Sequence, residues 1–192
     1  MMAMHTLSRS INSAVFQNTK NQNRSFFYWL TVVFNRVDEK RRKEIGPDLA
    51  CAQWLLRNGA SVRWKGHSEQ LTDYNVLPDS GNYFIEAVEA DNAGICDIGF
   101  QHFEGCKHIK KVKLENCRYI DNNAMNCLSL LQDSLTNLEI INCKSVSDDG
   151  VFKLKVLKNL ETLKIKGLPA VDNNIVQKEL TEALPNCKID IE

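Results

Sequence analysis

Residues 135–143 read LTNLEIINC, with apolar side chains at 135, 138 and 140 and a cysteine at 143. The same frame, L-x-x-L-x-L-x-x-C/L, recurs at 109–117 (IKKVKLENC) and at 160–168 (LETLKIKGL). Weaker copies begin at Ile85 and at Leu184. The second apolar position falls at residues 88, 112, 138, 163 and 187, in steps of 24, 26, 25 and 24. A period of this length is typical of leucine-rich repeats.

The frame predicts one short strand in each repeat, with its apolar side chains pointing inward. No repeat buries these side chains alone, so neighbouring repeats must stack. Polar residues follow each turn, and we expect Ser147 or Asp148 to cap a helix, because a side-chain oxygen there accepts the free N–H groups of the first turn. The predicted fold class is α/β, a short leucine-rich-repeat solenoid of about four and a half repeats at residues 81–192. The alternative is another α/β fold that contains five such strands.

A small helical N-terminal domain is predicted at residues 26–80, before the repeats. Residues 26–43, FFYWLTVVFNRVDEKRRK, predict one helix that ends at Gly46. Its nine mostly apolar residues would cover about 14 Å, half of a bilayer's hydrocarbon thickness, so the segment does not span a membrane. Pro47 is placed to begin a second helix, which Gly59 ends. Residues 60–64 alternate like a strand that caps the open end of the repeats.

Two sets of basic residues are candidate partner-binding surfaces. The first is the end of the N-terminal segment, which could contact an anionic membrane surface or a membrane-sector protein. The second lies between the apolar strand positions, on the strand face where solenoids commonly bind partners, although an ordinary solvated face is an alternative. The candidates are Arg41, Arg42 and Lys43 in the first set and Lys111, Lys113, Lys164 and Lys166 in the second.

The first 37 residues contain four basic residues and no Asp or Glu. This composition, without a secretory apolar core, predicts a mitochondrial transit peptide at residues 1–25. Arg24 lies two residues before Phe26, which suggests cleavage after Ser25. The alternative is a disordered cytosolic N-terminus. Residues 81–192 carry 17 acidic and 13 basic residues, a net charge of −4, which excludes bulk nucleic-acid binding by the repeats.

The sequence offers no catalytic or small-molecule site. Its four histidines lack metal-ligand spacing, and it contains no Gly-rich phosphate loop. None of its seven cysteines forms a C-x-x-C pair, and their odd number argues against a disulfide framework. Cys117, Cys143 and Cys187 occupy apolar repeat positions, where a free thiol serves as a small hydrophobic side chain. We therefore expect a non-enzyme with reduced cysteines.

Several segments together resemble the family of mitochondrial ATP synthase subunit s, also called coupling factor B, and the resemblance covers residues 26–192. It rests on residues 26–38, 45–48, 54–57, 59–60, 62–63, 73–75, 77–78, 98–100, 102 and 104–105. It implies a peripheral protein on the matrix side of the mitochondrial inner membrane, needed for coupled proton conduction through the membrane sector of the F-type ATP synthase.

The resemblance also implies a Mg²⁺ site at Gly59 and Asp91, partly through backbone carbonyls. Asp91 replaces an uncharged residue there, and a carboxylate is compatible with a hard cation. The closely spaced thiol pair of the family is not reproduced, since only Cys96 remains in that region. Two alternatives stay open: an assembly factor for the membrane arm of respiratory complex I, and an F-box-like substrate-recognition repeat protein. No F-box-like helical trio precedes the repeats, which weighs against the second alternative.

Overall fold

The computed structural model describes residues 29–192. The predicted transit peptide, its cleavage point and the start of the apolar segment lie outside these residues. The chain forms two units, of which the first ends at Val33 and is helical over residues 29–33. The second unit, Phe34–Glu192, contains all the surfaces described below.

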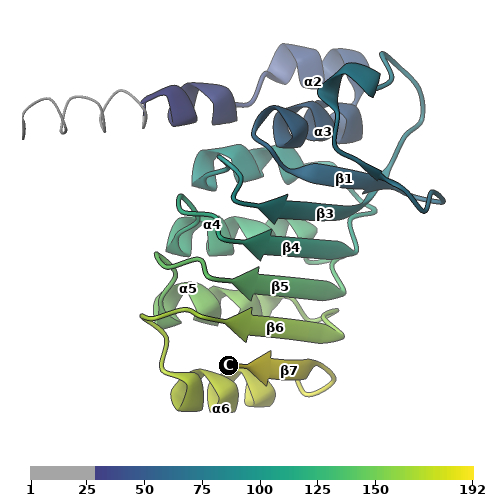
Figure 1. Cartoon of the computed structure of the whole chain (residues 1–192). Coiled ribbons are helices and arrows are strands. Elements are labelled where there is room, and N and C mark those ends of the chain that lie inside the picture. Colours follow the sequence, from purple (N-terminus) through teal and green to yellow (C-terminus); the bar gives the residue numbers. More distant parts are fainter. Residues whose placement is uncertain (1–28) are drawn as a thin grey trace, which may run out of the picture. The chain divides into compact units, whose positions relative to one another are not determined.

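The second unit is built on one sheet of seven strands in the order β2-β1-β3-β4-β5-β6-β7 (Figure 1). Strand β1 (Ser61–Trp64) pairs antiparallel with both β2 (Gln70–Leu71) and β3 (Ile85–Asp91). From β3 onward, every neighbouring pair is parallel. The remaining strands are β4 (Lys111–Glu115), β5 (Asn137–Ile141), β6 (Thr162–Lys166) and β7 (Lys188–Ile191). The α/β class is confirmed, as is a strand at 60–64 that pairs with the first predicted repeat.

The predicted period appears in the register of the parallel strands. Equivalent positions of successive repeats lie opposite one another: Val88, Val112, Leu138 and Leu163. The prediction for the last repeat is wrong, because Leu163 lies opposite Ile189 rather than Cys187. Helix α6 (Asn173–Ala183) precedes this strand. The step from Leu163 to Ile189 is 26 residues, the same as from Val112 to Leu138, so the last strand lies two residues beyond its predicted position.

Each repeat leaves its strand through a residue with a left-handed backbone. Asn92, Asn116 and Asn142 have φ values of 50°, 53° and 54°, and Gly167 has 66° at the same place in the next repeat. Asparagine and glycine adopt this conformation more readily than other residues. The residue that follows each of them is buried: Ala93, Cys117, Cys143 and Leu168. The Asn-Cys pairs of the sequence frame are therefore a turn residue followed by a core residue.

The helices that connect the strands lie on one face of the sheet and leave the other face uncovered (Figure 1). They are α4 (Asn122–Cys127), α5 (Asp148–Lys153) and α6, with the 3₁₀ segments η2 (Asp97–Phe103), η3 (Leu128–Leu131) and η4 (Leu154–Val156). Because side chains alternate along a strand, the apolar positions face these helices and form a continuous core. The strand residues between them face away from the helices.

Two of the three helices have an Asp cap. The carboxylates of Asp121 and Asp172 each accept hydrogen bonds from two backbone N–H groups in the first turn of α4 and α6. The capping expected of Ser147 or Asp148 is wrong. Ser147 Oγ instead accepts from Asn122 Nδ2 at 2.9 Å, and Asp148 Oδ1 accepts from the backbone N–H of Asp172 at 2.8 Å. Through these hydrogen bonds, both side chains link neighbouring repeats.

The single helix expected between Phe26 and Gly46 is also wrong. Helical structure ends at Asn35, residues 36–38 break it, and α2 covers Glu39–Ile45. Asp38 caps α2 by accepting from Arg41 N at 2.9 Å. The predicted ends at Gly46 and Gly59 are confirmed: both have positive φ values, 87° and 84°, and they flank α3 (Pro47–Arg57). Within residues 29–192, no helix combines the length and apolar character needed to cross a membrane.

Candidate binding surfaces

The uncovered face of the sheet carries charges of alternating sign. Glu89, Lys113, Glu139, Lys164 and Asp190 lie opposite one another from β3 to β7. A groove of about 260 Å³ crosses the first part of this row, between Arg63 and Thr162. The predicted lysines of this face therefore lie among carboxylates of the same sheet. The face as a whole carries charges of both signs and is not a basic surface.

Two of the four predicted strand lysines are already paired. Lys113 Nζ lies 2.7 Å from Glu115 Oε2, and this hydrogen bond is the main reason that the pKa of Lys113 is raised. Lys166 pairs with Glu192, which raises the pKa of the lysine and lowers that of the glutamate. Lys111 and Lys164 form no ion pair with any residue from 29 to 192. No ion pair within the described residues holds these two lysines, so their ammonium groups are available to a partner.

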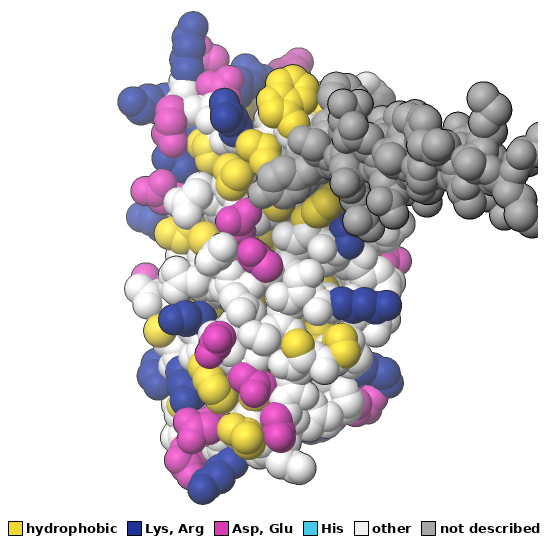
Figure 2. Space-filling view, turned by 90° about the vertical axis from the view of Figure 1, so that its left-hand side faces the viewer, with side chains coloured by type: hydrophobic (Ala, Val, Ile, Leu, Met, Phe, Trp, Pro, Cys, Tyr) yellow, Lys and Arg dark blue, Asp and Glu magenta, His cyan; other side chains and the backbone are white. Residues whose placement is uncertain are grey.

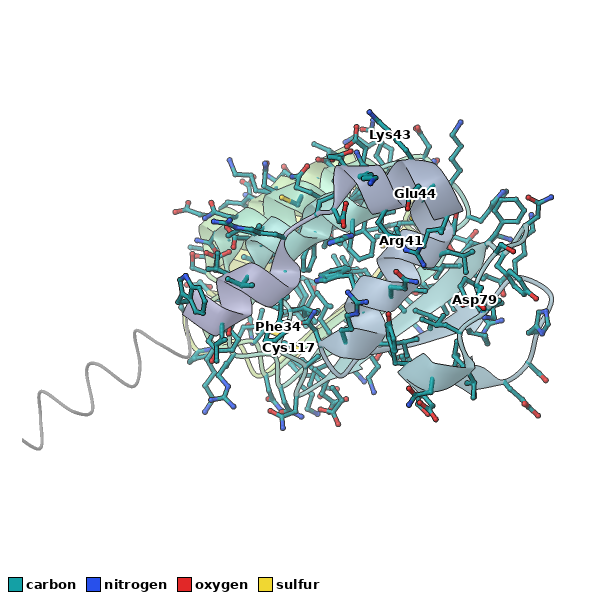
Figure 3. All side chains as sticks on the ribbon, turned by 90° about the horizontal axis from the view of Figure 1, so that it is seen from above. Phe34, Arg41, Lys43, Glu44, Asp79 and Cys117 are labelled. Carbon is teal, nitrogen blue, oxygen red and sulfur yellow. The ribbon has the colours of Figure 1, made fainter. Side chains whose placement is uncertain are left out.

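In the basic run of α2, Arg41 and Arg42 have ion-pair partners, whereas Lys43 has none within residues 29–192. Arg42 is only 17% exposed and pairs with Glu39 at 2.8 Å and with Glu104 at 3.1 Å. Arg41 lies on the side of α2 that faces α3, whereas Lys43 points away from it (Figure 3). Lys43 is exposed and makes no ion pair within the described part of the chain. Arg42 thus joins α2 to η2, and Lys43 is the free cation among the three predicted residues.

The two residues of the implied magnesium site lie at the same end of the sheet. Ser61, at the start of β1, is opposite Glu89 in the antiparallel pair of β1 and β3, and Gly59 and Asp91 lie two residues beyond this pair on either strand. Both residues are exposed, and Asp91 Oδ1 accepts from Asn116 Nδ2 at 2.8 Å, which leaves Oδ2 for another contact. A carboxylate and a backbone carbonyl are hard oxygen donors, and Mg²⁺ usually keeps several waters. The two residues could offer such an ion one carboxylate oxygen and one backbone carbonyl, and residues 29–192 contain no cluster of three or more metal-ligating side chains.

A fourth surface, which we call the arginine pocket, lies between α2, α3 and η2. Its volume is about 170 Å³, and its lining includes Arg36, Asp38, Arg41, Arg57, Trp54 and His102. Of these residues, the sequence predicted a role only for Arg41. The others come from separate segments, and no motif or spacing links them in the sequence.

The edge of the sheet at which the parallel strands end carries uncharged side chains together with scattered charged ones of both signs (Figure 2). A groove of about 720 Å³ there is lined by the three turn asparagines together with Arg118, Lys144 and Ser145. Along the edge, Asn142 Nδ2 donates to Asn116 Oδ1 at 3.1 Å, and Asn116 Nδ2 donates to Asp91 Oδ1 at 2.8 Å. The asparagines are thus used in linking neighbouring repeats.

The buried cysteine thiols have low reactivity. All seven thiols are free, and burial raises the pKa of Cys117 and raises that of Cys143 to about 12. Such thiols stay protonated at neutral pH, and the thiolate is the reactive form. The prediction that repeat cysteines serve as small hydrophobic side chains is confirmed for Cys117 and Cys143, which are both 0% exposed, whereas Cys187 is half-buried.

The chain is similar along its whole length to two curated proteins, the mitochondrial ATP synthase subunits s of Rattus norvegicus and Mus musculus. Identity to each is 40% over 197 aligned residues, which cover 100% of this chain and 98% of the relative. The mitochondrial ATP synthase subunit s of Homo sapiens is 40% identical over 176 residues, or 88% of each chain. No family model matches the sequence.

Proposed function

This chain belongs to the mitochondrial ATP synthase subunit s family, and we propose that it is a non-catalytic coupling subunit of the mitochondrial F-type ATP synthase. In this role it supports coupled proton conduction through the membrane sector. The observation that carries the proposal is the 40% identity across the whole chain, since a likeness of one domain alone would leave the rest unexplained.

The finer fold assignment belongs to the same proposal. We infer that the parallel part of the sheet is a leucine-rich-repeat solenoid, in which β3 to β7 are the repeat strands. The in-register apolar positions, the left-handed turn residue after each strand from β3 to β6, and the helices on one face all support this assignment.

The proposed location is the matrix side of the inner mitochondrial membrane, with peripheral attachment. The word mitochondrial in the names of the relatives and the acid-free start of the sequence support import into this compartment. Removal of residues 1–25 stays a prediction. N-terminal sequencing of protein from isolated mitochondria measures it, and protein with an intact Met1 in the cytosol would contradict it.

The proposed contacts are with membrane-sector subunits of the ATP synthase, with an anionic membrane surface as a second contact. Lys111 and Lys164 are the best candidates on the strand face, because their charges are not paired within the described chain. Lys43 is the candidate on α2 for the same reason. Arg41, Arg42, Lys113 and Lys166 contribute less, since each already has a partner.

A magnesium ion at Gly59 and Asp91 is part of the proposal. The Gly59 carbonyl and the free oxygen of Asp91 would hold it, and it would join the end of α3 to the end of β3. Such an ion supplies a structural link and no reaction step.

Affinity purification of the tagged chain from mitochondria tests the proposed function. We expect ATP synthase membrane-sector subunits to co-purify with the wild-type chain, and less of them with the Lys111→Glu/Lys164→Glu double variant. Arg118→Glu/Lys144→Glu is the matched control, because it reverses two charges on a different edge of the sheet. Recovery of complex I subunits or of ubiquitin-ligase components, without ATP synthase, would contradict the proposal.

A further inference from the structure

Three guanidinium groups from separate segments line the arginine pocket. Arg36 precedes α2, Arg41 lies within α2, and Arg57 ends α3. Asp38 is the one carboxylate among the lining residues, so the charged groups of the lining sum to +2. Guanidinium groups match the geometry of phosphate and carboxylate oxygens. The lining therefore favours an anion.

The positive charge of the pocket is only partly compensated by its surroundings. Arg41 Nε donates to Gln53 at 3.4 Å, and its Nη1 lies 3.9 Å from Glu44. Arg57 donates to the hydroxyl of Tyr74 and lies 4.8 Å from the centre of that ring, so its partner is neutral. The side chain of Arg36 makes no hydrogen bond or ion pair with residues 29–192. The guanidinium group of Arg36 is therefore available to bind a ligand.

His102, one of the residues that line the pocket, is buried. The ring of His102 stacks on that of Trp54, with centroids 5.0 Å apart and planes 5° apart. His102 is only 6% exposed, and its Nε2 lies 3.3 Å from the carbonyl oxygen of Arg36. A carbonyl only accepts, so Nε2 carries the hydrogen and Nδ1 is left as an acceptor. Nδ1 has no hydrogen-bond partner in the described chain, and buried polar groups normally have one.

We propose that the arginine pocket binds a single phosphate group. Its volume of about 170 Å³ is below the roughly 300 to 1,000 Å³ of ordinary small-molecule sites, so it takes a compact group and excludes a nucleotide base. The oxygens of the phosphate accept from the guanidinium groups, of which that of Arg36 has no partner within residues 29–192. A phosphate group offers more acceptor oxygens to three guanidinium groups than a carboxylate does. The phosphate comes from a free phosphate compound or from a phospholipid headgroup.

Thermal melting of the full chain tests the site, with inorganic phosphate as the probe and potassium chloride at matched ionic strength as the reference. We expect the melting temperature to rise with phosphate, because a ligand of the folded state stabilises it. Arg36→Gln should weaken the apparent affinity about tenfold, as loss of a charge-assisted hydrogen bond implies. Lys43→Gln, which removes the same charge outside the pocket, should change it less than about twofold.

Vesicles of phosphatidylcholine, with and without an anionic phospholipid, identify the source of the phosphate group. Binding to anionic vesicles that inorganic phosphate displaces and Arg36→Gln loses assigns the site to a headgroup. Phosphate binding without an Arg36-dependent vesicle contact assigns it to a free phosphate compound. A phosphate effect no larger than that of chloride, or equal losses in Arg36→Gln and Lys43→Gln, would overturn the proposal. The assay uses the isolated chain, so its result is separate from the test of the proposed function.

Discussion

The buried amide of Asn35 accepts a hydrogen bond from the indole N–H of Trp54 at 2.9 Å. The same oxygen accepts from the backbone N–H of Cys96 at 3.1 Å, and Nδ2 donates to the carbonyl of Gly94 at 2.9 Å and to Asn58 Oδ1 at 3.3 Å. One side chain that is 0% exposed therefore joins the segment before α2 to α3 and to the turn after β3. It also fixes the indole against which His102 stacks.

Asn35→Ala should destabilise the fold by about 3 kcal/mol or more. The change leaves the Trp54 N–H and the backbone groups of Gly94 and Cys96 without their partner, and each buried unsatisfied group costs about 1 to 3 kcal/mol. Urea unfolding followed by circular dichroism measures the loss. Asn126→Ala, at an exposed helix position, is the control and should change stability by less than about 0.5 kcal/mol. Equal losses of stability in the two variants would show that the hydrogen bonds of Asn35 do not stabilise the fold.

Leu138→Ala should destabilise the fold by about 2 to 5 kcal/mol, because Leu138 is 0% exposed at the centre of β5 and its truncation leaves a cavity. Ile141→Ala in the same strand is the matched control. Ile141 lies on the uncovered face and is half-buried, so its loss should be distinctly smaller. A stability change below about 0.5 kcal/mol for Leu138→Ala, measured by urea unfolding, would contradict the assigned core.

Acidification should destabilise the wild-type chain more than His102→Phe. Burial, followed by the positive charge of Arg42, lowers the pKa of His102, although its bond to the Arg36 carbonyl opposes this. The unfolded chain, with an ordinary pKa near 6.5, then binds more protons, so stability falls as the pH drops below about 6.5. By pH 5.5, this contribution is at most about 1.4 kcal/mol.

Melting temperatures between pH 7.5 and 5.5 test this prediction. The other three histidines are present in both proteins, so the difference between the two pH profiles isolates His102. Phenylalanine keeps a flat ring against Trp54 and removes the titrating group. Parallel pH profiles would mean that His102 titrates alike in the folded and unfolded chains.

Magnesium should raise the melting temperature of metal-free protein if Gly59 and Asp91 bind it. At a magnesium concentration ten times the dissociation constant, the folded state would be stabilised by about 1.4 kcal/mol. Asp91→Ala should lose the magnesium-dependent shift, whereas Asp133→Ala, at an exposed position away from the pair, should keep it. A shift of equal size in both variants, or none in the wild type at millimolar magnesium, would leave the two residues with structural roles alone.

The sequence by itself determined the α/β class, the positions of four of the five parallel strands and the ends of α2 and α3. These features follow local rules: side chains alternate along a strand, apolar positions repeat with the stacking of strands, and glycine adopts positive φ values at Gly46 and Gly59. The family was also evident from the sequence, and the 40% identity confirms it.

The sequence misplaced the last strand and the caps of the central helix, because both depend on neighbours that are distant along the chain. Ser147 and Asp148 have the side chains of helix caps, yet Asn122 and the backbone of Asp172 lie within reach and take their hydrogen bonds. In the last repeat, Cys187 and Ile189 are both apolar candidates for the second strand position, and only the pairing with Leu163 selects Ile189.

Tertiary structure alone decided which charges are free and where a pocket forms. Arg42 and Lys43 are neighbours in one basic run, but Arg42 pairs with Glu104, 62 residues away in the sequence, and Lys43 is exposed. Arg36, Arg57 and His102 come from separate segments and line one pocket. Charge pairing and pocket formation depend on distances of a few ångströms between segments far apart in sequence, and no local pattern encodes those distances.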